Sequence, residues 1–242
     1  MVTEKNVVIL GGGFGGLRAA IDIDRGLKKA GITNHKVILI DQNPYHVFTP
    51  LLYEIATVGG EHFSREKLQS LAAYPIFDLL RDTSVFFKQT QVLQIDFNKC
   101  RVHLLKSEQI PFEYLVIALG AETAYFGIPG LKENSFSLKT LEDAILIRSR
   151  LRDLINGTKK GEGTRIIIGG GGSTGIELAA EIRCFLKYLA GRAIEIILLE
   201  ATPTLLPGFD EKVTRLAQKK LERLGVRVMT NKPVSSVGFH EA

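Results

Sequence analysis

Short apolar runs alternate along the chain with stretches in which apolar residues recur at helical spacing. The clearest runs are VVIL from Val7, KVILID from Lys36, RIII from Arg165 and EIILLE from Glu195. A glycine-rich segment and then a helical pattern follow the first and the third of these runs. The pattern therefore predicts two strand–helix–strand units, which build parallel sheets in α/β proteins.

The segments around these units also have recognisable patterns. Between the first unit's second strand and the next sheet strand, the sequence predicts a loop over 41–60, a helix over 63–80 broken at Pro75, a β-meander over 86–105 and a strand over 112–120. Thr140 and Asp143 predict a capping box at the start of a helix that ends at Asn156-Gly157. A helix over 211–224 and a strand over 226–229 complete the predicted elements.

The glycines repeat in register. GxGxxG lies between strand and helix in both units, and 30 residues separate its first glycine from an acid at the tip of the second strand. The two sets are Gly11, Gly13, Gly16 with Asp41, and Gly170, Gly172, Gly175 with Glu200. One GxGxxG is weak evidence, whereas two in matched register predict two dinucleotide sites.

Each position in this pattern has a physical role. The first glycine permits a tight turn, the second lets backbone approach a pyrophosphate, and the third lets helix and strand pack closely. The helix N-terminus then faces the phosphates, so the turn residues Phe14, Gly15, Ser173 and Thr174 are also candidate cofactor-binding residues. Asp41 and Glu200 are expected to bind a ribose, although a solvated strand-end carboxylate is the simpler alternative. Glu200 would repel a 2′-phosphate, which favours NAD(H) over NADP(H).

We therefore predict an α/β fold of two Rossmann-type dinucleotide-binding domains. The first, 1–158, would carry the inserted β-meander, and the second, 164–242, would follow a KKGEG linker over 159–163. The second half has fewer strands than a full dinucleotide-binding half, so we expect a truncated chain.

Composition narrows the chemistry. A net charge of +5 with scattered basic residues fits small anionic ligands and predicts no nucleic-acid partner. The two cysteines and five histidines lack metal-ligand spacing, so no metal is expected. No apolar run approaches the ~18 residues of a membrane span. The segment 41–74 has no cysteine, which makes electron relay to a protein disulfide improbable.

Several segments resemble type II NADH:quinone oxidoreductases. They are IDQNPYHVFTPLLYEIATVGG over 40–60, FEYLVIALGAETAYFGIPGL over 112–131 and LLEATPTLLPGFDEKV over 198–213. The resemblance implies that the first half, with Asp41, binds the ADP part of FAD and that the second half, with Glu200, binds NADH.

The resemblance also implies roles for individual residues. Glu177 would lie near nicotinamide and flavin, and Val92 would contact adenine through its backbone; Thr49, Pro50, Ala118, Leu119 and Gly120 would line the flavin. Each has a purely structural alternative: a carboxylate in a first helical turn for Glu177, a β-branched strand residue for Val92, and packing or turn positions for the others. His46, beside Tyr45, is expected to be structural.

The implied activity is that of a respiratory-chain flavoprotein that passes hydride from NADH to FAD and electrons to a quinone, without proton pumping. The resemblance further implies a cytoplasmic protein that can form a homodimer. A C-terminal region absent here would dock on the inner face of the cytoplasmic membrane, so we expect this chain to be deficient in FAD retention and quinone reduction. The alternatives are a ferredoxin- or sulfide:quinone-type flavin reductase and a non-catalytic NAD(H)- or FAD-binding module.

Overall fold

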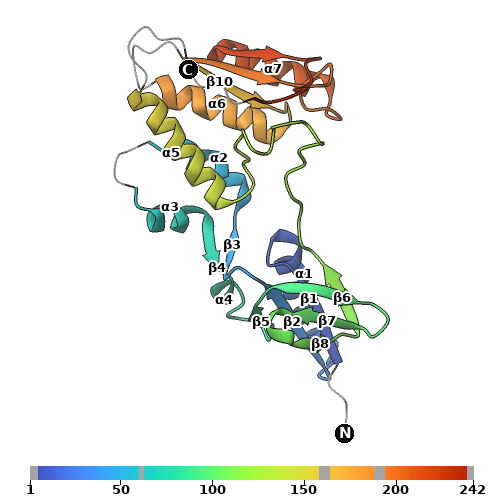
Figure 1. Ribbon diagram of the computed structural model, residues 1–242. Helices are drawn as coiled ribbons and strands as arrows, with labels where there is room; N and C mark the ends of the chain where they lie inside the picture. Colours follow the sequence, from blue (N-terminus) through green and yellow to red (C-terminus); the bar gives the residue numbers. More distant parts are fainter. Residues whose placement is uncertain (1–4, 60–62, 158–163, 188–193, 239–242) are drawn as a thin grey trace. The chain divides into compact units, whose positions relative to one another are not determined.

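The computed structural model describes residues 5–59, 63–157, 164–187 and 194–238. The chain divides into two compact units. The first consists of Met1–Phe48 with Ala73–Glu122, and the second of Thr49–Ala72 with Thr123–Ala242. Figure 1 follows the chain through both units by colour.

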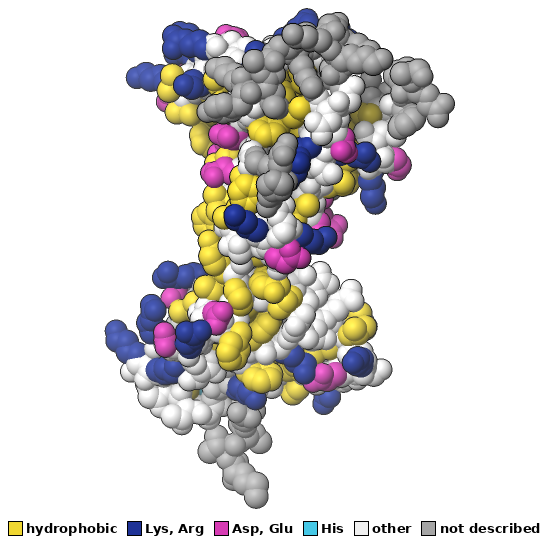
Figure 2. Space-filling view, turned by 90° about the vertical axis from the view of Figure 1, so that its left-hand side faces the viewer, with side chains coloured by type: hydrophobic (Ala, Val, Ile, Leu, Met, Phe, Trp, Pro, Cys, Tyr) yellow, Lys and Arg dark blue, Asp and Glu magenta, His cyan; other side chains and the backbone are white. Residues whose placement is uncertain are grey.

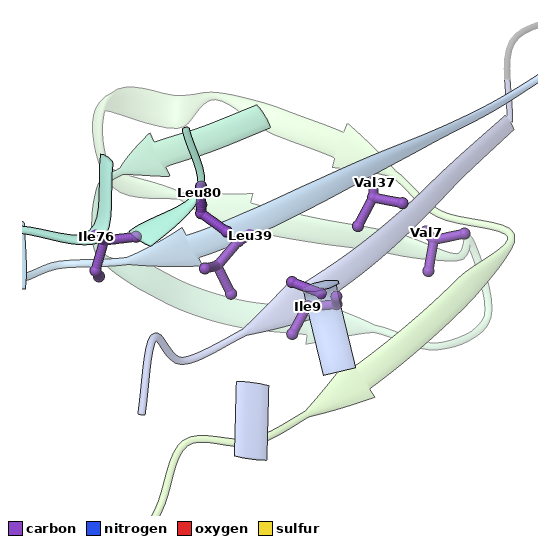
Figure 3. Close-up of a cluster of buried hydrophobic side chains, with 7 residues drawn as sticks. Val7, Ile9, Val37, Leu39, Ile76 and Leu80 are labelled. Carbon is purple, nitrogen blue, oxygen red and sulfur yellow. The ribbon is translucent and has the colours of Figure 1, made fainter. Parts of the chain in front are cut away.

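The first unit is built on a parallel sheet of four strands. These are β1 (Lys5–Leu10), β2 (His35–Asp41), β5 (Phe86–Gln89) and β9 (Tyr114–Ile117), in the order β5-β2-β1-β9. Alternate side chains of β1 and β2 enter two separate clusters, as strand geometry requires. Val7, Ile9, Val37 and Leu39 lie on one face, together with Ile76 and Leu80 (Figure 3).

Different elements cover the two faces of this sheet. Helix α1 (Phe14–Lys29) packs on the face of Val7 and Ile9 through Ala20 and Leu17. The opposite face packs against an antiparallel meander of β6 (Val92–Asp96), β7 (Arg101–Leu104) and β8 (Gln109–Pro111), which is followed directly by β9. The 3-10 turn η2 (Leu105–Ser107) joins β7 to β8.

The meander begins later than the sequence predicts. Residues 86–89 form β5, which pairs in parallel with β2 and belongs to the central sheet. The physical reason is that Phe87 packs against the cluster of Ile9 and Leu39, which places β5 along the open edge of β2. The meander proper is therefore 92–111.

The prediction of a loop over 41–60 is wrong. The segment contains β3 (Tyr45–Val47), the 3-10 turn η1 (Thr49–Leu51) and helix α2 (Leu52–Thr57). Leu52, Ile55 and Ala56 are buried at helical spacing, and this packing stabilises a helix too short to persist alone.

Residues 63–80 are only partly helical. Helix α3 (Arg65–Ala72) is followed by β4 (Ala73–Pro75), which pairs antiparallel with β3, and then by α4 (Ile76–Leu79). Pro75 therefore ends a short strand and precedes a helix, as its missing N–H allows.

The second unit contains a parallel sheet in the order β10-β11-β12: β10 (Thr164–Gly169), β11 (Ile194–Leu199) and β12 (Val226–Met229). Helices α6 (Ser173–Lys187) and α7 (Glu211–Leu224) pack against its strands, and α2 packs on α5 (Leu141–Gly157) and on α6. The predicted helix 211–224 and strand 226–229 are confirmed, as is the α/β class with parallel sheets.

The division of the chain by cofactor into 1–158 and 164–242 remains a prediction. Its linker, 159–163, lies outside the described residues. Segments 49–72 and 123–157, which precede that linker, are part of the second compact unit.

The start of α5 has the predicted capping box. The backbone N–H of Asp143 donates to Thr140 Oγ1 at 3.1 Å, and the N–H of Thr140 donates back to Asp143 Oδ2 at 3.0 Å. The same carboxylate oxygen also accepts from the Ser137 hydroxyl and the Lys139 N–H. Asp143 thus satisfies several donors that a helix start would otherwise leave unpaired.

Removal of this cap should destabilise the second unit. We expect Thr140→Ala to lower its free energy of unfolding by about 0.5–2 kcal/mol, because Ala leaves the Asp143 N–H without its acceptor. Urea unfolding followed by circular dichroism measures the change. Thr140→Ser keeps the hydroxyl and is the matched control, and equal losses in both variants would contradict a capping role.

Candidate dinucleotide-binding loops

The first glycine loop joins β1 to α1, and two of its glycines are required by the fold. Gly11 has φ of +100°, and a Cβ there would overlap the carbonyl oxygen of Ala118. A Cβ on Gly16 would overlap the carbonyl oxygen of Gly11. These positions allow the tight turn and the close approach of helix to strand.

The second loop, between β10 and α6, repeats this geometry. Gly170 has φ of +105°, and a Cβ on Gly175 would overlap the Gly170 carbonyl oxygen. Both glycine turns therefore lie at strand-to-helix junctions, as the sequence predicts.

The middle glycines are different. No described protein atom lies within 4 Å of a Cβ built on Gly13 or on Gly172. Gly13 has φ of −73°, which any residue adopts, so its backbone does not demand glycine either. The fold therefore does not require glycine at these positions. The absence of a side chain there leaves open space beside the backbone, which suits the approach of a ligand phosphate.

Both acids bind the loop of their own unit. Asp41 accepts from the N–H of Gly12 at 2.6 Å and from the N–H of Asn43 at 2.7 Å. Glu200 accepts from the N–H of Gly171 at 2.6 Å and from the N–H of Thr202 at 2.7 Å. Each carboxylate thus fixes the glycine loop to the tip of the second strand.

Sequence reasoning assigned these acids only to a ribose and missed the bond to the loop. The available signal was that each acid stands at the end of the strand that neighbours the loop-bearing strand. A carboxylate has about four acceptor sites, so two hydrogen bonds from backbone N–H groups leave it able to accept a further hydrogen bond from a hydroxyl. Asp41 is partly exposed, whereas Glu200 is only 8% exposed.

The environment of Glu200 has opposing effects on its pKa. Burial raises it, but hydrogen bonds from the N–H groups of Thr202 and Gly171 lower it, and the net pKa lies below the ordinary value. The charged form is therefore the one that the folded protein stabilises.

Glu177 is the fifth residue of α6, and the first turn of that helix contains no acid. It is exposed, and it shares a helix face with Glu181, four residues on. The interpretation of Glu177 as a first-turn carboxylate is therefore wrong, while its proposed place near nicotinamide and flavin remains a prediction.

Tyr53 of α2 lies within the electrostatic reach of this face, and the sequence did not single it out. Its pKa is raised first by burial and then by the charge of Glu177, with smaller effects from Glu54 and Glu181. The available signal was its place in the FTPLLY segment, directly before Glu54.

The expected flavin-lining residues lie in both units. Ala118, Leu119 and Gly120 follow β9 in the first unit, and Ala118 adjoins the glycine loop, because its Cβ would lie 3.3 Å from a Cβ on Gly16. Thr49 and Pro50 lie in η1 of the second unit. Val92 is the first residue of β6 and packs on the cluster of Val8 and Leu10. Their contacts with a cofactor remain predictions.

Other kinds of site find no support in the part of the chain that the structure describes. There, no group of His, Cys, Asp and Glu side chains could hold a metal ion. No helix among these residues is long and apolar enough to cross a membrane. On the face drawn in Figure 2, Lys and Arg side chains are scattered among Asp and Glu instead of gathering in one patch.

The bonds of Glu200 should make stability depend on pH. Because its pKa is lowered on folding, its contribution is fully present above the pKa of the unfolded chain and is lost as pH falls through the folded-state pKa. We expect Glu200→Gln to lower the free energy of unfolding by about 1–3 kcal/mol at neutral pH, since its amide group leaves a buried N–H without an acceptor. Urea unfolding at a series of pH values should show this difference shrinking as pH falls. Exposed Glu122 gives the control Glu122→Gln, and a loss from Glu200→Gln that is constant with pH would contradict the assignment.

The Tyr53 phenol offers a second test. We expect Glu177→Gln to lower the pKa of Tyr53, because it removes a negative charge that disfavours the phenolate. Ultraviolet titration of the tyrosines measures the change, and Tyr53→Phe identifies which part of the curve belongs to Tyr53. Glu122→Gln should leave the curve unchanged, and an unchanged curve in Glu177→Gln would show that the two side chains do not interact.

Known proteins are similar to this chain in sequence. The family model described as pyridine nucleotide-disulphide oxidoreductase matches residues 5–240. A demethylphylloquinone reductase of Synechocystis sp. is 35% identical over 97% of this chain and 55% of its own length. A type II NADH:quinone oxidoreductase of Mycobacterium tuberculosis is 30% identical over 98% of this chain and 51% of its own length. The resemblance inferred from the sequence is thereby confirmed.

Solved structures have the same fold. NDH2 from Plasmodium falciparum aligns with a TM-score of 0.80 at 24% identity, over 98% of this chain and 50% of that one. The sulfide:quinone oxidoreductase from Aquifex aeolicus aligns with a TM-score of 0.79 at 26% identity, over 97% and 52%. The chain spans about half the length of the relatives it matches. Because the family model covers nearly all of its residues, the chain belongs to the pyridine nucleotide-disulphide oxidoreductase family.

Proposed function

We propose that this chain carries the two nucleotide-binding loops of an FAD-dependent NADH:quinone oxidoreductase. The first loop binds the ADP part of FAD, and the second binds NADH. The observation that carries this proposal is the open space at Gly13 and Gly172, where the fold itself does not require glycine.

The helices behind the loops fit this role. Neither α1 nor α6 has an acidic residue in its first turn, so the unpaired N–H groups and the positive end of each helix dipole face no competing carboxylate there. A pyrophosphate at these helix starts would accept hydrogen bonds from the backbone without repulsion.

The two acids fix the conformation of the loops and retain acceptor sites for a sugar hydroxyl. Asp41 and Glu200 fix the N–H groups of Gly12 and Gly171, and their remaining acceptor sites would take a ribose hydroxyl. The negative charge of Glu200 supports NAD(H) over NADP(H), because a 2′-phosphate would be repelled.

The redox chemistry would be supplied by FAD held at the first loop, as the carrier of electrons between a reduced nicotinamide and an acceptor. The protein's own residues supply position. Burial and the charges of Glu177 and Glu54 raise the pKa of Tyr53, whose phenol hydroxyl can donate a hydrogen bond at neutral pH. Ala118 and Gly120 leave little side-chain volume after β9, which suits a flat ring close to backbone.

The acceptor and the cellular setting are proposals for the whole protein. The names of the Synechocystis and Mycobacterium tuberculosis relatives support a quinone as acceptor. A quinone is membrane-soluble, so we place the protein peripherally at the inner face of the cytoplasmic membrane, as a protein that can form a homodimer.

The proposal is tested by the middle glycines. We expect Gly13→Ala to weaken FAD binding about tenfold or more with NADH binding unchanged, and Gly172→Ala to do the reverse, because each methyl group enters the space of one pyrophosphate. Flavin fluorescence and nicotinamide fluorescence measure the two affinities, and anaerobic bleaching of bound flavin by NADH reports hydride transfer.

Gly16→Ala and Gly175→Ala are the matched controls. They should lower thermal stability, because their methyl groups would overlap backbone oxygens, whereas Gly13→Ala and Gly172→Ala should not. Nucleotide binding without bleaching would identify a binding module. Unchanged affinities in both middle-glycine variants would contradict the assignment of the first loop to FAD and of the second to NADH.

A further inference from the structure

His46 is buried against the first glycine loop. It lies on β3, is 7% exposed, and its Nδ1 lies 3.0 Å from the carbonyl oxygen of Gly12. A carbonyl oxygen can only accept, so Nδ1 carries a proton and donates it to this bond. The side chain is therefore a hydrogen-bond donor to the loop as well as a packing residue.

This bond fixes the orientation of one peptide group. The carbonyl of Gly12 and the N–H of Gly13 belong to the same planar trans peptide, in which they point in opposite directions. When His46 holds the carbonyl on its side, the Gly13 N–H must point away from His46. Gly13 is the residue whose missing side chain leaves open space.

Asp41 holds the same residue from its other end. Gly12 donates its N–H to Asp41 and accepts from His46, so both of its backbone polar groups are bound by side chains. Rotation of the Gly12–Gly13 peptide would break the bond to His46 and leave a buried nitrogen unpaired, which costs about 1–3 kcal/mol.

In the second loop a different donor fixes the equivalent peptide group. Gly171, the equivalent of Gly12, donates to Glu200 and accepts at 2.9 Å from the backbone N–H of Leu206. The peptide before Gly172 is thus held by the main chain, whereas the peptide before Gly13 is held by one side chain. The equivalent carbonyl, that of Gly12 or Gly171, accepts a hydrogen bond in both loops. This repetition indicates that the orientation of the peptide group matters in both.

Aromatic packing fixes the imidazole itself. The ring of Phe14, at the start of α1, meets the His46 ring edge to face at 4.8 Å and also contacts Phe48 at 5.5 Å. The pairing of His46 with Tyr74 between β3 and β4 holds its backbone. With ring and backbone both fixed, Nδ1 has little freedom to leave the Gly12 carbonyl.

We propose that His46 is a positioning residue of the first dinucleotide loop, which turns the Gly12–Gly13 peptide so that the Gly13 N–H is presented to the pyrophosphate of FAD. The inference rests on the proposed function of that loop. In this proposal His46 does not contact the ligand and affects its binding only by orienting the backbone.

A pair of variants that differ in the ability to donate a hydrogen bond tests the inference. Asn can place an amide N–H where Nδ1 lies, whereas Leu cannot donate. We expect His46→Leu to weaken FAD binding about tenfold, measured by flavin fluorescence, and His46→Asn to stay within about threefold of the unchanged protein. NADH affinity, which belongs to the other loop, should change in neither. Tyr45→Phe, on the neighbouring position of β3, is the control and should bind FAD normally.

The possible outcomes separate the inference from the proposed function. If added FAD gives no measurable binding to the unchanged protein at any concentration, both are overturned; the deficient FAD retention expected of this chain still gives a measurable affinity. If it binds FAD and His46→Leu binds equally well, or if His46→Asn loses as much affinity as His46→Leu, only the role of His46 is overturned. Nitrogen-15 spectra of the imidazole provide a measurement that needs no variant: a ring with Nδ1 unprotonated would also contradict the inference, whatever the folding of His46→Leu.

Discussion

The hydrogen bond between a strand-tip carboxylate and a glycine-loop amide is the interaction on which the shape of both glycine loops depends. It links Asp41 to Gly12 and Glu200 to Gly171 at the same distance, 2.6 Å, although one acid has a longer side chain than the other. Charge-assisted bonds to backbone amides are among the stronger hydrogen bonds in proteins. Loop shape, strand end and helix start are thereby joined at a single point in each unit.

Sequence predicted most of what depends on local pattern. The parallel strands, the helix 211–224 and the capping box of Thr140 were all accessible, because apolar spacing and cap residues specify them locally. The strand–turn–helix position of both glycine loops was accessible as well. What sequence missed depends on partners far away in the chain: the pairing of β5 with β2, and the interaction of Tyr53 with Glu177. Such contacts leave no mark in the spacing of neighbouring residues.

The course of the chain between the two compact units is a further feature that sequence reasoning did not predict. Neither compact unit is continuous, since residues 49–72 leave the first unit and pack with the second before the chain returns at 73. The buried side chains of Leu52 and Ile55 make 49–72 part of a core whose other members follow 123. The two compact units are therefore each assembled from separate stretches of the sequence.

The two ways of holding the loop peptide imply unequal tolerance to mutation. In the second loop the donor is the main-chain N–H of residue 206, which every substitution except proline preserves. In the first loop the donor belongs to the imidazole of residue 46, and most replacements abolish it. Substitution therefore removes the donor readily at position 46 and only through proline at position 206, although the two residues bind equivalent carbonyls, those of Gly12 and Gly171.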